Sequence, residues 1–230
     1  MSEFISDFIG VFGNPAQTIA RVMDKKRWQA ALAVILLVTA VCTFVTFPVT
    51  KAEQAQFIRD SAMAEKLSDD QLANLDKFTP TQRVTGALYA TVFAALTLVV
   101  AAFFVYLFFK VGGAEGLYVN YFSGMAFASL LDMGLGMILK SSLILVKKTM
   151  LVQTGLTMFF PGLDFRSLPF ILLAQFDFFS LWYLAALALG IAVFAKISPR
   201  KSISITIMYF LFKSLVVVSA SYLAMRMVGM

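Results

Sequence analysis

Apolar blocks of about 20 residues recur along the chain, and they constrain its fold more than any other feature, because this is the length of helix that crosses roughly 30 Å of hydrocarbon. Hydrophobic residues make up 60% of the 230 positions and charged residues 14%. Soluble domains carry about 45–50% and about 25%, respectively. The sequence therefore predicts an all-α protein, a polytopic bundle of helices in a membrane.

The apolar blocks predict five transmembrane helices, separated by charged or Gly- and Pro-rich stretches. The expected spans are residues 29–49, 84–110, 118–139, 176–195 and 202–225, within one membrane domain of residues 29–225. The helical pattern around the second span already starts at Pro80 and continues to Lys110. At 1.5 Å per residue this is longer than the hydrocarbon core, so the second span is expected to tilt or to project into water.

Residues 1–28 predict two amphipathic helices at the membrane interface. Apolar residues at i, i+4 and i+8 from Phe4 give the first helix one apolar face. Asn14, Pro15 and Gln17 predict a capping box at the start of the second helix, with Asn14 as the N-cap.

Two longer stretches between the spans lack a clean apolar pattern. Residues 50–83 carry five cations and six acids, and predict a helical extracytoplasmic loop with capping boxes at Ser68–Gln71 and Thr79–Gln82. The stretch after the third span is interrupted by Lys, Gly and Pro, and predicts a semi-apolar loop along the outer interface.

The basic residues before the first span set the expected orientation. Lys25, Lys26 and Arg27 favour a cytoplasmic N-terminus, and Trp28 suits the headgroup level. Residues 1–28 lack the order of regions found in a cleavable signal peptide. Five spans then place the C-terminus outside the cytoplasm. Ten cations fall outside and eight inside, but those inside lie in short segments beside the spans, where charge weighs most.

The residue types that the chain lacks argue against an enzyme. It has no histidine, and its single cysteine, Cys42, lies in the first apolar block. The commonest general base and metal ligand is therefore missing, and no disulfide can form within the chain. We predict no catalytic residue, no metal and no cofactor. The net charge of +6 is scattered over loops, which fits a membrane surface better than a nucleic acid.

Two helix faces that carry a charged residue lie inside the expected spans. Gly124, Ala128, Asp132 and Gly136 recur every four residues, which predicts a helix-packing face on which Asp132 meets a protein neighbour. In the last span, Ser202, Thr206, Tyr209 and Lys213 likewise share one face.

Lys213 lies in an apolar run and needs a partner inside the membrane. Its depth matches that of Asp132, so the sequence predicts an Asp132–Lys213 pair, with Asp177 as second choice because it lies nearer the outer interface. Such a pair either fixes the register of the bundle or takes part in transport. The structural role is favoured, since no repeated halves or matching broken spans are found in the sequence.

Several segments of the chain resemble the Yip family of five-span membrane proteins, in its bacterial branch. They are "NPAQTIARV", "LSDDQLANL", the "GGAEG" turn and "FDFFSLWYLAALALGIAVFAKISPRKS". The family-like positions are Asn14, Pro15, Gly113, Phe179, Trp182 and Gly190. The resemblance implies a cytoplasmic N-terminus, a C-terminus across the membrane and no catalytic residues.

The functional implications of the resemblance are broad. Eukaryotic members resemble trafficking factors that bind small GTPases, but this chain lacks their long N-terminal tail, and some bacterial relatives are associated with ABC-type efflux machinery. We therefore expect a non-enzymatic adaptor or accessory subunit of the bacterial inner membrane. Its expected partners are membrane lipids and other integral membrane proteins, such as an ABC-type transporter or a second copy of itself. The alternative is a small transport or ion-conducting component that uses Asp132 and Lys213.

Overall fold

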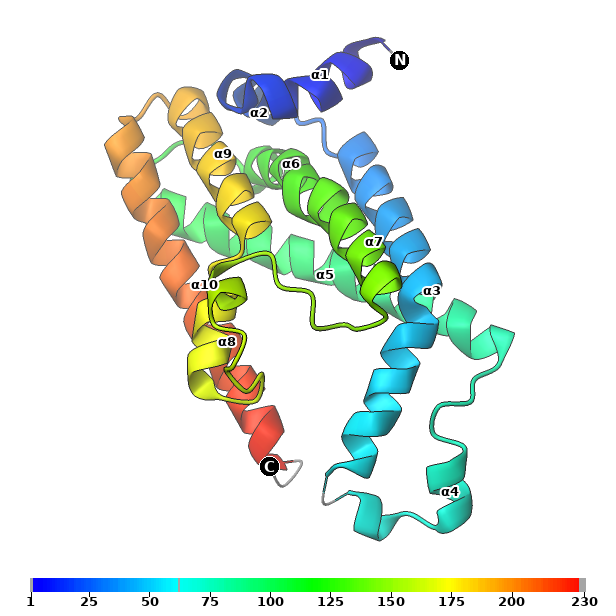
Figure 1. Cartoon of the computed structure of the whole chain (residues 1–230). Coiled ribbons are helices and arrows are strands. Elements are labelled where there is room, and N and C mark those ends of the chain that lie inside the picture. Colours follow the sequence, from blue (N-terminus) through cyan, green and yellow to red (C-terminus); the bar gives the residue numbers. More distant parts are fainter. Residues whose placement is uncertain (1, 62, 228–230) are drawn as a thin grey trace.

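The computed structural model describes residues 2–61 and 63–227, and every regular element in these residues is a helix (Figure 1). The α-helices are α1 (Ser2–Gly13), α2 (Pro15–Asp24), α3 (Gln29–Arg59), α4 (Asp69–Ala73), α5 (Pro80–Val111), α6 (Tyr118–Ala128), α7 (Met137–Lys147), α8 (Leu168–Ala174), α9 (Phe178–Phe194) and α10 (Pro199–Met227). Two short 3₁₀-helices, η1 (Ala64–Lys66) and η3 (Leu156–Phe159), and one π-helical segment, η2 (Leu130–Gly136), complete the elements. The predicted all-α class is confirmed.

Four helices in the described residues are long and apolar enough to cross a membrane. They are Gln29–Arg59, Pro80–Val111, the continuous stretch Tyr118–Lys147 and Pro199–Ala224. The chain is therefore a multi-pass membrane protein. The remaining expected span corresponds to α9, whose 17 residues are apolar but shorter, and the count of five spans stays a prediction.

Helix α3 continues well past the end predicted for the first span. It runs through Pro48 to Arg59, so the polar connection starts at Asp60 and not at residue 50. Proline at position 48 cannot donate to the carbonyl of Phe44, four residues earlier. Arg83 of α5 supplies the missing donor: its Nε lies 2.6 Å from the Phe44 oxygen, and its guanidinium lies 4.0 Å from the Phe44 ring centroid. The proline is accommodated because a neighbouring helix satisfies the freed carbonyl.

The connection between α3 and α5 forms a polar lobe, described over residues 60–61 and 63–79, which we expect to lie outside the membrane and call the extramembrane lobe. Ser68 caps α4, and Thr79 caps α5 with Pro80 as its first residue. Both predicted capping boxes are confirmed, since the side-chain oxygens of Gln71 and Gln82 accept hydrogen bonds from the backbone amides of Ser68 and Thr79, respectively. Arg59 holds the lobe against the end of α3, because it donates to the Leu72 carbonyl and to Asp76, each at 3.1 Å.

The third long helix changes from α-helical to π-helical geometry in its middle. Residues Leu130–Gly136 are π-helical, and the helix then continues as α7 to Lys147, eight residues past the predicted end of the span. The following stretch carries η3 and α8, and is tied to the start of α9 by an antiparallel bridge between Gly155 and Asp177. It exposes large apolar side chains such as Phe159 and Phe160, as expected for a semi-apolar loop.

Helix α9 is largely buried by its neighbours. Most of its residues are buried, including Tyr183, Leu187 and Ile191, and it packs against α2, α6 and α10. One apolar stripe, with Leu181 and Leu189, stays exposed, and an apolar helix of this kind is typical of a position in a membrane. Gly190 lets α2 approach closely, because a Cβ at that position would lie 2.3 Å from Ile19 Cγ2.

The two N-terminal helices lie against one end of the bundle, whereas the last described turn of α10 lies at the other end (Figure 1). Helix α2 is partly inserted, with Ile19, Val22 and Met23 fully buried. In α1, Phe4 packs against the core while Ile5 and Ile9 are exposed. The apolar residues of α1 are thus divided between the protein core and the surface, and an interfacial position of α1 stays a prediction.

Candidate functional site

A polar cluster joins α7, α9 and the π-helical segment η2. Lys140 Nζ lies 3.7 Å from Asp132 Oδ1 and 3.1 Å from Asp177 Oδ1, so one ammonium group bridges two carboxylates. Ser180 donates a 2.9 Å hydrogen bond to the second oxygen of Asp132. We refer to Asp132, Lys140, Asp177 and Ser180 as the intramembrane cluster.

Asp177 has a full set of donors. As the N-cap of α9 it accepts hydrogen bonds from the backbone amides of Phe179 at 3.0 Å and Ser180 at 3.2 Å. Lys140 donates to the same oxygen, and the Thr154 hydroxyl donates to the other. The sequence placed Asp177 inside the span, near its outer end. In the structure it is the residue before the helix, a position at which an aspartate is stabilised by the free amides and the helix dipole.

The predicted Asp132–Lys213 pair is wrong. Asp132 pairs with Lys140, and Lys213 forms no ion pair within 4 Å with any of the described residues. Its Nζ instead lies 6.0 Å from the centroid of the Tyr183 ring, within Coulombic range of both Asp132 and Asp177. The physical reason is the length of the third helix: because it continues to Lys147, Lys140 is in the bundle and not in the loop, and it reaches both acids.

The π-helical turn also changes the packing face predicted for the third span. Gly124 on α6 meets α2, since a Cβ there would lie 2.7 Å from Met23 Cγ. Gly136 at the end of η2 meets α9, where a Cβ would lie 2.8 Å from Phe179 Cγ. Ala128 is buried between them. The small residues allow close approach, but to two different helices.

Lys213 and Tyr209 belong to the side of α10 that faces the bundle and a neighbouring groove. Tyr209 is buried, with its ring 6.1 Å from that of Phe108 on α5. Lys213 lines a groove of about 390 Å³ between α5 and α10, whose other walls include Phe93 and Phe104. The two predicted polar residues therefore lie beside the intramembrane cluster without being bonded into it.

The family-like positions are distributed over the packing contacts. Asn14 precedes α2, but it makes no side-chain cap hydrogen bond, so the predicted capping box is wrong there; Pro15 is the first residue of α2, as predicted. Gly113 adopts a φ of +78° in the turn after α5, where glycine is strongly favoured. The Trp182 ring packs edge-on against Phe12 at 6.5 Å, which ties α9 to α1.

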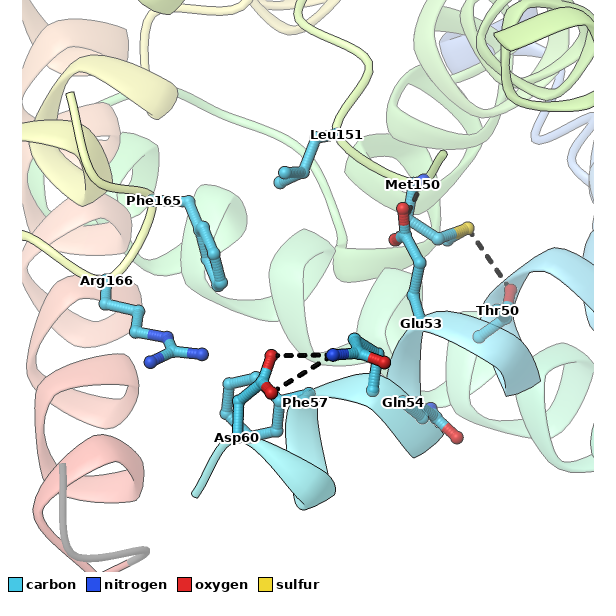
Figure 2. A pocket seen from close by; sticks show the side chains of 10 residues that line it. Thr50, Glu53, Gln54, Phe57, Asp60, Met150, Leu151, Phe165 and Arg166 are labelled. Carbon is cyan, nitrogen blue, oxygen red and sulfur yellow. Dashed lines mark hydrogen bonds between the residues drawn. The ribbon is translucent and has the colours of Figure 1, made fainter. Parts of the chain in front are cut away.

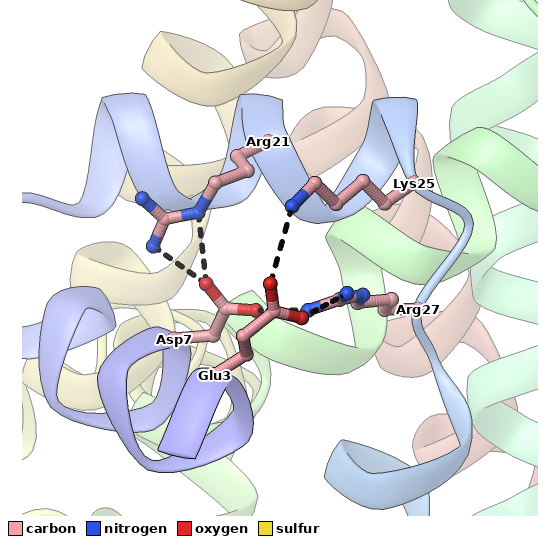
Figure 3. Close-up of polar contacts among 5 residues, drawn as sticks. All are labelled: Glu3, Asp7, Arg21, Lys25 and Arg27. Atoms are coloured by element: carbon pink, nitrogen blue, oxygen red, sulfur yellow. Dashed lines mark hydrogen bonds and ion pairs between the residues drawn. The ribbon is translucent and has the colours of Figure 1, made fainter. Parts of the chain in front are cut away.

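A second charged cluster joins α1, α2 and the turn between α2 and α3 (Figure 3). Arg21 donates two hydrogen bonds to Asp7, at 2.8 Å and 2.5 Å, and Arg27 lies 3.5 Å from the other Asp7 oxygen. Arg27 also bonds to Glu3, and Lys25 lies 3.9 Å from it. The hydrogen bond from Arg27 lowers the pKa of Glu3 below its usual value, and the charges of Arg27 and Lys25 lower it further. These contacts hold the two N-terminal helices to the bundle.

Sequence reasoning missed Lys140, Ser180 and Thr154. The spacing of Lys140 eight residues after Asp132 would have suggested the contact, had the helix been read past residue 139. In the part of the chain that the structure describes, no three His, Cys, Asp or Glu side chains are grouped so that they could hold a metal ion. The cation between the two carboxylates is therefore a lysine of the chain itself.

Comparison with known proteins identifies the family. The model of the Yip1 domain matches residues 9–221, from α1 into α10, and this range includes the intramembrane cluster. Comparisons with curated proteins and with solved structures gave no match. Because the family model covers most of the chain, the resemblance to the Yip family is confirmed, whereas the bacterial branch and the five spans stay predictions. This multi-pass membrane protein belongs to the Yip1 family.

Proposed function

We propose that this chain is a non-enzymatic adaptor or accessory subunit that binds other integral membrane proteins. In this proposal it lies in the bacterial inner membrane with five spans, a cytoplasmic N-terminus and an extracytoplasmic C-terminus. An ABC-type transport or efflux assembly is the expected kind of partner, and self-association is the other expected contact.

The observation that carries the proposal is the pairing of the intramembrane acids with the chain's own donors. Asp177 accepts from two backbone amides, Lys140 and Thr154, and Asp132 accepts from Ser180 and lies beside Lys140. A carboxylate has about four acceptor sites, so Asp177 has little capacity left for a transported ion or proton. The cluster supports a role in holding α9 against the third helix, and this favours a scaffold over a conductor.

An adaptor needs a surface that reaches a partner, and the extramembrane lobe supplies the best candidate. Asp69 and Asp70 are exposed in the first turn of α4, and Lys66 and Lys77 are exposed beside them. The backbone and Arg59 hydrogen-bond the carboxylate of Asp76 and lower its pKa, so the ion pair between Arg59 and Asp76 persists to a lower pH than an unperturbed aspartate would allow. The lobe is therefore a charged and ordered surface beyond the apolar helices.

The test is affinity purification of the full chain from mildly cross-linked native membranes. We expect a stoichiometric membrane protein to co-purify, and the exposed charge reversal Asp70→Lys to reduce its yield at least several-fold. Glu115→Lys is the matched control, because Glu115 is equally exposed but lies in the turn between α5 and α6. Absence of a stoichiometric partner, or equal loss with both variants, would argue against the proposal.

A second function, transport, is favoured by one observation. Lys213 lines the groove between α5 and α10 and has no ion-pair partner within 4 Å among the described residues. In proteoliposomes, a flux that the wild type carries and Lys213→Met abolishes would support transport over the adaptor. A chain that carries no flux in either form supports the adaptor.

A further inference from the structure

A pocket of about 430 Å³ lies between the polar end of α3 and the segment after α7 (Figure 2). One wall comes from α3, with Glu53, Phe57 and Asp60, and the other from Met150, Leu151, Phe165 and Arg166. The pocket begins at Thr50, one residue past the apolar block that predicts the first span. In a bilayer this level corresponds to the headgroups, since about 20 residues of α3 already cross the hydrocarbon.

Arg166 is held in the pocket without an acceptor for its buried nitrogen. Its guanidinium lies 5.0 Å from the centroid of the Phe57 ring and 5.1 Å from that of Phe165, so two aromatic faces fix its position. Its Nε is buried and has no hydrogen-bond partner, and no carboxylate of the described chain lies within 4 Å of the guanidinium. A buried donor of a charged group without an acceptor is costly, and a guanidinium fork matches phosphate oxygens.

Two carboxylates lie on the opposite wall. Glu53 accepts a 2.9 Å hydrogen bond from the Met150 amide, and Asp60 accepts from Gln56 at 3.0 Å and 3.1 Å. Each carboxylate has acceptor capacity beyond these neutral donors. The pocket thus presents a cation on one wall, acids on the other and apolar side chains on both walls (Figure 2).

We infer that this pocket binds a zwitterionic aminophospholipid. Its phosphate would pair with Arg166, its primary ammonium would donate to Glu53 and Asp60, and its glycerol and upper acyl region would lie against Phe57, Phe165 and Leu151. A choline headgroup has no N–H to donate to the acids. A glycerol headgroup has no cation, so the two carboxylates would repel its phosphate. The inference does not depend on the adaptor proposal, because a chain without a protein partner can still bind this lipid.

The test uses the full chain in detergent, with retention of added lipid measured by native mass spectrometry. Phosphatidylethanolamine, phosphatidylcholine and phosphatidylglycerol with identical acyl chains are compared. We expect the wild type to retain phosphatidylethanolamine about tenfold better than either other lipid. Arg166→Gln should lower that retention about tenfold, as expected for the loss of one charge-assisted contact, whereas Arg166→Lys keeps most of it. Lys66→Gln, an exposed cation of the lobe outside the pocket, is the matched control.

The acids are tested with the double variant Glu53→Gln/Asp60→Asn. It should lower retention of phosphatidylethanolamine to the level of phosphatidylcholine and raise that of phosphatidylglycerol, while Glu65→Gln changes neither. Equal retention of the three lipids by the wild type would overturn the inference, even if Arg166→Gln folds poorly. Unchanged retention of phosphatidylethanolamine in both Arg166→Gln and the double acid variant would also overturn the inference.

Discussion

The contact between Arg83 and the carbonyl of Phe44 gives the sharpest stability prediction. Pro48 leaves that carbonyl without its helical donor, and Arg83 Nε satisfies it at 2.6 Å while stacking on the Phe44 ring. A hydrogen bond from a charged group contributes about 1.5–3 kcal/mol and a cation–π contact about 0.5–1 kcal/mol. Arg83 is half-buried, so solvent screens part of this. We expect Arg83→Gln to lower the free energy of unfolding by about 1–2 kcal/mol.

The same geometry predicts that Arg83 and position 48 are coupled. In Pro48→Ala the new backbone N–H can bond to the Phe44 carbonyl, so Arg83 loses part of its role. The loss of unfolding free energy caused by Arg83→Gln should therefore be about 1 kcal/mol smaller in the Pro48→Ala background than in the wild type. The assay is reversible unfolding of the purified chain in mixed micelles with increasing SDS.

The matched control is Arg200→Gln, an exposed arginine at the start of α10, which should change stability by less than about 0.5 kcal/mol. Additive effects of Arg83→Gln and Pro48→Ala would refute the reasoning, because they would mean that Arg83 does not act through the freed carbonyl.

Three further predictions concern the bundle and its N-terminal helices. Lys140→Met should lower the free energy of unfolding by about 1–3 kcal/mol, and by less in an Asp177→Asn background, which already lacks the shorter of its two ion pairs. Lys147→Met on the exposed face is the neutral control in the same micelle assay. Gly190→Ala should cost about 1–3 kcal/mol, since its Cβ would overlap Ile19, whereas thermal unfolding of Gly162→Ala, with open space around it, should match the wild type. The pKa of Glu3 is lowered in the folded chain from 4.5, so its contribution is present above pH 4.5 and lost as the pH falls through the folded value. As the pH falls through the folded pKa of Glu3, hydrogen exchange of α1 should accelerate in the wild type, and no such acceleration should occur in Glu3→Gln. An identical acceleration in both proteins would exclude Glu3 as its origin.

Much of the fold follows from local patterns that the sequence displays directly. The long apolar helices, the capping boxes at Ser68 and Thr79 and the start of α5 at Pro80 were all predictable, because each depends on neighbouring residues. The end of α3 was not predictable from hydropathy, since polar residues from Lys51 to Arg59 continue a helix after it has left the apolar block. Hydropathy predicts which residues lie in the hydrocarbon, whereas a helix such as α3 can continue beyond it.

The candidate site was predicted only in part, for a related reason. Asp132, Asp177 and Lys213 were singled out because charges in apolar runs need partners, but the choice of partner depends on helix register. The π-helical turn around Asp132 alters that register, and no single residue pattern announces it. The lysine that binds both acids was assigned to a loop because the predicted span ended at residue 139, one residue before it. Lys213, which the sequence shows as the anomaly, lies over the Tyr183 ring and forms no ion pair within 4 Å with any of the described residues.

The two ends of the bundle are built differently, and this bears on where partners can bind. At the end covered by α1 and α2, the turns after α5 and after α9 are short, and the salt bridges of the second charged cluster occupy the charges of α1 (Figures 1 and 3). At the other end, α3 continues past its apolar block into the lobe, and the segment between α7 and α9 carries exposed aromatic side chains. Exposed cations without an ion pair among the described residues occur at the first end as well, such as Lys196 and Arg200 beside the turn after α9. The second end adds exposed aromatic side chains to its unpaired charges, and such a surface has free energy to gain from a partner. We therefore expect lipid and protein partners to bind on the side of the bundle opposite the N-terminal helices.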